Sequence, residues 1–210
     1  MKLIKLNRNK EEILNTISHA AGVLFGIFGL IYLLFKNKKN TDFSTISIWI
    51  YGVSMIALFL SSTFYHYLES GKLKNRARIL DHMSIFLLIA GTYTPVCLIT
   101  LEKSSGWLLF TIVWSIAALG IILKIFLTGK VDKLSLLLYL SMGWLIIFDI
   151  RNIIDLMSLQ ALIFLIIGGL LYSLGTIFYV IEKIPYSHFI WHLFILGGSI
   201  SHFFMVDSLV

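Results

Sequence analysis

The sequence has few charged residues, one cysteine and two prolines, and each scarcity excludes a class of protein. Only 13% of the 210 residues are charged and 58% are hydrophobic, whereas soluble domains have about 25% charged and about 45–50% apolar residues. So little charge cannot cover so much apolar surface in water, which excludes a disordered chain, a coiled coil and an ordinary soluble enzyme. Cys97 is alone, so neither an intrachain disulfide nor a zinc–thiolate cluster can form.

The sequence also lacks a Gly/Ser-rich linker, a low-complexity tract and a clear short repeat. No series of carboxylates runs through the apolar stretches, which disfavours a proton or ion transporter. What remains is a polytopic membrane protein. A membrane-crossing helix needs about 20 residues, so seven would use about 140 and leave no room for a separate soluble domain.

We therefore predict an all-α fold, a bundle of seven transmembrane helices in a single domain, residues 1–210. The first apolar run follows several basic residues, but it is long and ends in a basic cluster, so we interpret it as a retained helix rather than a signal peptide. The fifth run is the shortest. The predicted helices span approximately residues 17–35, 43–67, 79–100, 106–127, 134–148, 156–181 and 187–206.

Basic residues are distributed unevenly between the two predicted sides of the membrane. Of the 17 lysines and arginines, twelve lie in segments on the side of the N-terminus and five lie on the opposite side. Cytoplasmic loops carry an excess of lysine and arginine, so we predict a cytoplasmic N-terminus and an outside C-terminus, in the plasma or bacterial inner membrane. We therefore attribute the net charge of +6 to the basic cytoplasmic segments of a membrane protein and not to nucleic-acid binding.

Histidines and one aspartate are the informative polar residues, because a buried charge costs about 2.5–3.5 kcal/mol in a membrane helix. His188 and His192 are four residues apart, which puts both imidazoles on one helical face. His66 ends the second predicted helix and Asp81 opens the third. The predicted orientation brings all four to the cytoplasmic side, and three histidines with a carboxylate have the composition of a catalytic Zn(2+) site.

A second polar group lies at the start of the first helix. Glu12, Asn15 and His19 have spacings of three and four, which place them on one helical stripe. Two interpretations stay open. In the first, the stripe orients the metal ligands from the side away from the ion; in the second, it is only the amphipathic start of a helix, where Glu12 is electrostatically favourable.

Two further histidines are predicted to have structural roles. His82 points about 100° away from Asp81 and is predicted to be an interhelical partner. His202 lies about 21 Å beyond His188 along the last helix, too far to share a metal ion. We interpret it as a hydrogen-bonded interior histidine.

Several blocks, in order along nearly the whole chain, resemble the bacterial hemolysin III family. That family is grouped with the progestin and adipoQ receptors, including the adiponectin receptors, and with alkaline ceramidases. The blocks are Glu12-x-x-Asn15-x-x-x-His19, Ser62-Thr-Phe-Tyr-His66, Leu80-Asp81-His82, Ala90-Gly91-Thr92-Tyr93-Thr94-Pro95, His188-Phe-Ile-Trp-His192 and Ser201-His202-Phe203-Phe204.

The resemblance implies seven transmembrane helices with a cytoplasmic N-terminus. It also implies a zinc ion held by His66, His188 and His192, with Asp81 interacting with water on the zinc and Ser62 beside the site. The family name implies lysis of cells.

Our hypothesis is a zinc-dependent hydrolase that acts on a membrane lipid amide or ester, such as a ceramide-like substrate. Asp81 would accept a proton from water and Ser62 would help to stabilise the oxyanion. Two alternatives stay open: a sensor or transducer with structural zinc, and a pore-forming cytolysin. Membrane lipids are the expected partners, and no nucleic acid is expected.

Overall fold

The computed structural model describes residues 2–181 and 183–210, and every regular element within them is a helix. Seven helical spans in these residues are long and apolar enough to cross a membrane, so the predicted all-α bundle is confirmed. The elements are α1 (Lys2–Lys36), α2 (Ser44–Tyr67), α3 (Lys72–Pro95), η1 (Val96–Thr100), α4 (Gly106–Leu127), α5 (Asp132–Gly143), η2 (Leu145–Asp149), α6 (Ile150–Leu156), α7 (Leu159–Val180) and α8 (Ser187–Asp207).

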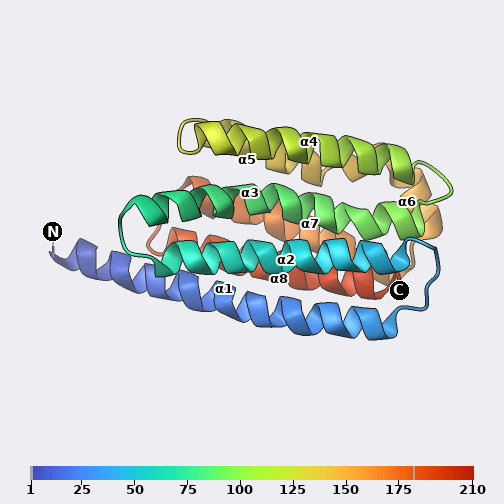
Figure 1. Ribbon diagram of the computed structural model, residues 1–210, viewed down its shortest axis with the longest axis horizontal. Helices are drawn as coiled ribbons and strands as arrows, with labels where there is room; N and C mark the ends of the chain where they lie inside the picture. The colour runs from blue at the N-terminus through green and yellow to red at the C-terminus, as the bar shows by residue number, and fades with distance from the viewer. Residues whose placement is uncertain (1, 182) are drawn as a thin grey trace.

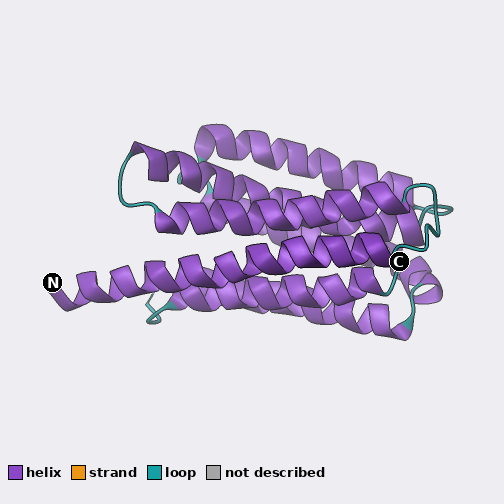
Figure 2. Cartoon of the chain, turned by 60° about the horizontal axis from the view of Figure 1, so that its bottom comes forward, coloured by secondary structure: helices purple, strands orange, loops and turns teal. Residues whose placement is uncertain are grey.

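The spans form a closed ring in chain order. α1 packs on α2, α2 on α3, α3 on α4, and α5 contacts both α4 and α7. α7 then packs on α8, and α8 returns to α1 (Figure 1). Helices run side by side along the long axis, with the connecting loops at the two ends (Figure 2). One end therefore gathers the start of α1, the α2–α3 loop, the α4–α5 loop and the start of α8.

The first and third helices begin earlier than predicted. α1 starts at Lys2 rather than residue 17, and its N-terminal part projects beyond the neighbouring helices (Figure 1). α3 starts at Lys72 rather than residue 79. The predicted starts were set by hydropathy, but lysine, arginine and glutamate are good helix formers outside the apolar layer as well. The ends of α2, α4, α7 and α8 agree with prediction within three residues.

Proline changes the geometry of the third span near its far end. α3 ends as an α-helix at Pro95 and continues as a short π-helical segment, η1, in which the Leu101 N–H bonds the Val96 carbonyl. Pro95 has no N–H to donate to the preceding turn, so the regular α-helical ladder is interrupted there.

The fifth span is not the continuous helix predicted over residues 134–148. α5 ends at Gly143, and the chain continues through η2 into α6, which ends at Leu156. The Tyr93 hydroxyl bridges the break: it accepts the Ile146 N–H at 3.0 Å and donates to the Gly143 carbonyl at 3.0 Å. A side chain of α3 thus satisfies backbone groups that lipid could not.

Candidate metal centre

Three histidine side chains from two helices converge at the end of the bundle where α1 begins. His66 lies in the last turn of α2, and His188 and His192 occupy the first two turns of α8. One ligand nitrogen from each can be chosen so that all three lie within 4.8 Å of one another. Their ring centroids are 4.7–5.1 Å apart. α1 packs on both α2 and α8, so the end of α2 and the start of α8 come together although they are far apart in the sequence.

A carboxylate of α1 holds the His66 ring. Glu12 Oε2 lies 2.7 Å from His66 Nδ1, and the Asn15 side-chain nitrogen lies 3.4 Å from the same atom. The second Glu12 oxygen pairs with Lys74 Nζ at 3.2 Å. Since Nδ1 is engaged by Glu12, the other ring nitrogen, Nε2, is left for a metal. A histidine that binds a metal through one ring nitrogen commonly donates a hydrogen bond from the other nitrogen to a carboxylate.

Glu11, next to Glu12 in α1, contacts α8, the helix that carries His188 and His192. Glu11 Oε1 accepts the backbone N–H of His188 at 3.1 Å. The first N–H groups of a helix lack intrahelical acceptors, and a carboxylate there is favourable to the helix dipole. Glu11 was not predicted, because a cap supplied by another helix leaves no spacing pattern in the sequence. Glu11 and Glu12 together fix α8 and α2 to α1.

His19 lies one turn beyond Asn15 and is buried against the cluster. Its ring stacks on His192, with centroids 3.7 Å apart and planes 15° apart, and it meets Phe59 edge-on. Neither His19 nitrogen has a hydrogen-bond partner within residues 2–181 and 183–210. The stripe of Glu12, Asn15 and His19 therefore faces the histidine centre along its whole length.

Asp81 and Ser62 lie beside the three histidines. Ser62 is buried one turn before His66, and Asp81 is half-buried in α3. α3 packs on α2, and the Asp81 carboxylate is close enough to His66 for the two side chains to interact electrostatically. Two carboxylates and one hydroxyl therefore surround the three imidazoles: Asp81, Ser62 and Glu12, which contacts His66 Nδ1.

Unpaired polar atoms indicate that the arrangement fits a bound metal. A buried polar atom without a partner costs about 1–3 kcal/mol, so such atoms are rare in native proteins. Here they concentrate around the histidines, and neutral imidazole nitrogens are good zinc ligands. In the described part of the chain, the buried side-chain atoms without a hydrogen bond around this centre are His66 Nε2, His192 Nδ1, both His19 nitrogens, Ser62 Oγ and Asn15 Oδ1.

The other two histidines lie elsewhere. His82 faces α5: its Nδ1 is 3.9 Å from Asp132 Oδ1, and its backbone carbonyl accepts the Tyr139 hydroxyl at 2.8 Å. His202 is buried in the far half of α8, with Nε2 3.3 Å from the Leu165 carbonyl of α7. Neither belongs to the histidine centre.

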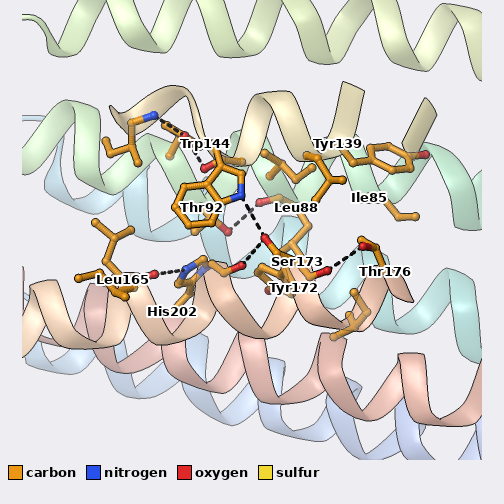
Figure 3. Close-up of a pocket in the computed structure, with 18 of the residues that line it drawn as sticks. Ile85, Leu88, Thr92, Tyr139, Trp144, Leu165, Tyr172, Ser173, Thr176 and His202 are labelled. Atoms are coloured by element: carbon orange, nitrogen blue, oxygen red, sulfur yellow. Dashed lines mark hydrogen bonds between the residues drawn. The ribbon is translucent and has the colours of Figure 1, made fainter. Parts of the chain in front are cut away.

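An apolar cavity of about 170 Å³ begins one helical turn from the centre. Its lining includes Trp191 and Ile195 of α8, which flank His192, and Ile85 of α3, which follows Asp81 by one turn. The cavity continues between α5 and α7, where Trp144 Nε1 donates to Ser173 Oγ at 3.0 Å (Figure 3). Tyr139, Tyr172, Thr176 and His202 also border it (Figure 3). Most of the residues that line the cavity are apolar, with a few polar groups among them.

Known proteins resemble the chain over almost its whole length. The family described as "Haemolysin-III related" matches residues 7–203. The chain is 46% identical to "Hemolysin-3" of Bacillus cereus over 94% of this chain and 90% of the relative. It is also 46% identical to "Hemolysin-3 homolog" of Bacillus subtilis (strain 168), over 94% and 93%. "Monocyte to macrophage differentiation factor" of Homo sapiens is 29% identical, over 93% and 83%.

Proposed function

The chain belongs to the haemolysin-III related family, and from that premise we propose that it is a zinc-dependent membrane hydrolase acting on a lipid amide or ester. Its seven apolar spans make it a multi-pass membrane protein. The site of action would be the membrane face where the histidines lie, which the distribution of basic residues predicts to be cytoplasmic.

The observation that carries the proposal is the approach of the three histidine ligand atoms to within 4.8 Å of one another. His66, His188 and His192 would hold the ion, and three protein ligands leave a position open, as in catalytic zinc sites. A zinc ion there would polarise a carbonyl group and make a water molecule more acidic.

The remaining polar groups have the chemistry that hydrolysis requires. The Asp81 carboxylate would accept a proton from water and return it to the leaving group. The Ser62 hydroxyl, which has no hydrogen-bond partner among the described residues, is available to donate to an oxyanion. Glu12 holds the His66 ring by Nδ1 and keeps Nε2 directed away from α1.

The cavity supports a lipid as the substrate. A long apolar chain would occupy the space that begins at Ile85, Trp191 and Ile195, while the polar amide or ester would remain near the histidines. The centre lies at the end of the bundle, where lipid headgroups meet the protein, so both parts of an amphiphile are accommodated.

The test separates catalysis from metal binding. Purified wild type, loaded with zinc in detergent micelles, is incubated with a panel of ceramides, phospholipids and acyl esters, and released fatty acid is measured. Asp81→Asn should keep its zinc and its fold but lose about 100-fold or more in rate, because the proton acceptor is removed. Zinc-loaded wild type that cleaves nothing across the panel would contradict the proposal.

The same variant addresses a sensor or transducer with structural zinc. Structural zinc sites usually have four protein ligands, and Asp81 is the residue that we would expect to be the fourth. In that case Asp81→Asn should weaken zinc binding together with stability, and no lipid should be cleaved by the wild type.

The name of the Bacillus cereus relative, "Hemolysin-3", favours lysis as a second candidate function. A pore-forming protein should release a trapped dye from liposomes independently of Asp81. Absence of leakage at protein densities that give measurable lipid cleavage would exclude this alternative.

A further inference from the structure

A second polar cluster lies at the same end of the bundle, on α3, α4 and α5. Lys124, in the last turn of α4, is 1% exposed, and its ammonium pairs with Asp132 Oδ1 at 2.9 Å. Arg78 of α3 pairs with Asp132 Oδ2 at 3.2 Å, and His82 Nδ1 lies 3.9 Å from Oδ1. The carboxylate of Asp132, at the start of α5, thus lies within ion-pair distance of a lysine, an arginine and a histidine.

The charges of this cluster do not balance. Among the described residues, Asp132 is the only carboxylate within ion-pair distance of Lys124 or Arg78. A buried ammonium is stable only when it is paired, and here its single partner is shared. The Arg78 side chain is 40% exposed and uses one of its five N–H donors on Asp132. Two cations therefore share one carboxylate at ion-pair distance, and Arg78 has free donors at the open side of the cluster.

The surroundings increase the positive potential. Arg76 of α3, Lys130 of the α4–α5 connection and Lys133 at the start of α5 are exposed at the same end. The turn between α4 and α5 lies along the guanidinium, since a Cβ on Gly129 would be 3.5 Å from Arg78 Nη1. Arg78 is therefore the exposed part of a cation pair whose other member, Lys124, is buried behind it.

We propose that Arg78 and Lys124 form a binding site for the phosphate of an anionic phospholipid in the leaflet at this end of the bundle. The site lies at the ends of transmembrane helices, where lipid phosphates are the abundant anions, and basic pockets between helix ends bind such headgroups. A guanidinium matches the geometry of a phosphate, and the buried ammonium adds charge that solvent does not screen. This lipid is distinct from the substrate of the histidine centre.

Native mass spectrometry tests the proposal with phosphatidylglycerol as the probe, titrated onto full-length protein in detergent, with phosphatidylcholine as the neutral comparison. Arg78→Gln should weaken binding of the first phosphatidylglycerol about tenfold, the loss expected for one charge-assisted contact. Arg76→Gln is the matched control, since it removes an exposed arginine two positions away on the same helix. It should bind nearly as wild type does.

Asp132→Asn distinguishes a lipid site from a closed ion network, provided that the variant stays folded by circular dichroism. Removing the competing carboxylate should strengthen binding of phosphatidylglycerol to the folded variant, whereas unchanged lipid binding would indicate a purely structural network and overturn the proposal. Equal loss in Arg78→Gln and Arg76→Gln would also overturn the site, because it would indicate general charge attraction. Displacement of the lipid by inorganic phosphate at equal concentration would overturn the lipid assignment in favour of free phosphate.

Discussion

At the scale of single residues, the histidine centre is organised by side chains that do not bind the metal themselves. Glu12 engages His66 Nδ1 and Glu11 caps the backbone at His188, so one short stretch of α1 positions ligands on two other helices. His19 stacks on His192 and restricts that ring. The proposed ligands are therefore held before a metal arrives, which lowers the cost of binding it.

Replacing Glu12 tests this arrangement. Glu12→Gln removes the negative charge behind His66, and we expect zinc affinity to fall about 10- to 100-fold, the usual cost of losing such a partner. Affinity is measured by competition with a chromogenic chelator on protein whose helical content is verified. Glu69→Gln is the matched control, because Glu69 is an exposed carboxylate in the α2–α3 loop. Equal affinities of Glu12→Gln and wild type would exclude a positioning role for Glu12.

The residues of the centre were predictable to different degrees. His188 and His192 followed from their spacing of four, and the charge distribution brought His66 and Asp81 to the same membrane side. The spacing of Glu12, Asn15 and His19 predicts that they share one face of α1. It does not predict whether that face contacts the metal ligands, because periodicity defines a helical face but not its neighbours. The Glu11 cap depends on a contact between α1 and α8, which no local pattern records.

At the scale of elements, the fifth span shows how tertiary contacts override a uniform apolar sequence. Residues 134–148 predict one helix by hydropathy, yet α5 ends at Gly143 and η2 follows. The break is compatible with a membrane because Tyr93 of α3 satisfies the Gly143 carbonyl and the Ile146 N–H. Hydropathy indicates whether a segment is apolar. It cannot predict a break that depends on a hydroxyl group of another helix.

Tyr93→Phe isolates that contribution. The change keeps the ring but leaves two backbone groups without their partner, so we expect the free energy of unfolding to fall by about 1–3 kcal/mol. Unfolding in mixed micelles of increasing sodium dodecyl sulfate content measures the difference. Tyr32→Phe, at a side chain that is half exposed on α1, should cost much less. Equal stability of Tyr93→Phe and wild type would indicate that the break is satisfied in another way.

At the scale of the whole molecule, the ring of helices gathers the functional features at one end. The histidine centre, the cation cluster and the projecting start of α1 all lie there. The fold class and the number of spans were predictable because seven apolar segments of membrane length leave few other architectures. The closure of the ring between α1 and α8 was not, since it joins the two ends of the sequence.

The orientation of the molecule is testable independently of its chemistry. The distribution of lysine and arginine predicts that the start of α1 is cytoplasmic and the end of α8 is outside. A green fluorescent protein fused to the N-terminus should fluoresce, and alkaline phosphatase fused to the C-terminus should be active outside the cytoplasm. The reverse pattern would place the histidine centre on the outer face.

Metal content tests the central claim most directly. Protein expressed with zinc in the medium and purified without chelators is analysed by inductively coupled plasma mass spectrometry. We predict one zinc ion per chain in the wild type, the same content in His202→Ala, and little or none in folded His188→Ala, because two histidines hold zinc weakly. Folded wild type without metal, or equal zinc in wild type and His188→Ala, would contradict the proposed centre of His66, His188 and His192.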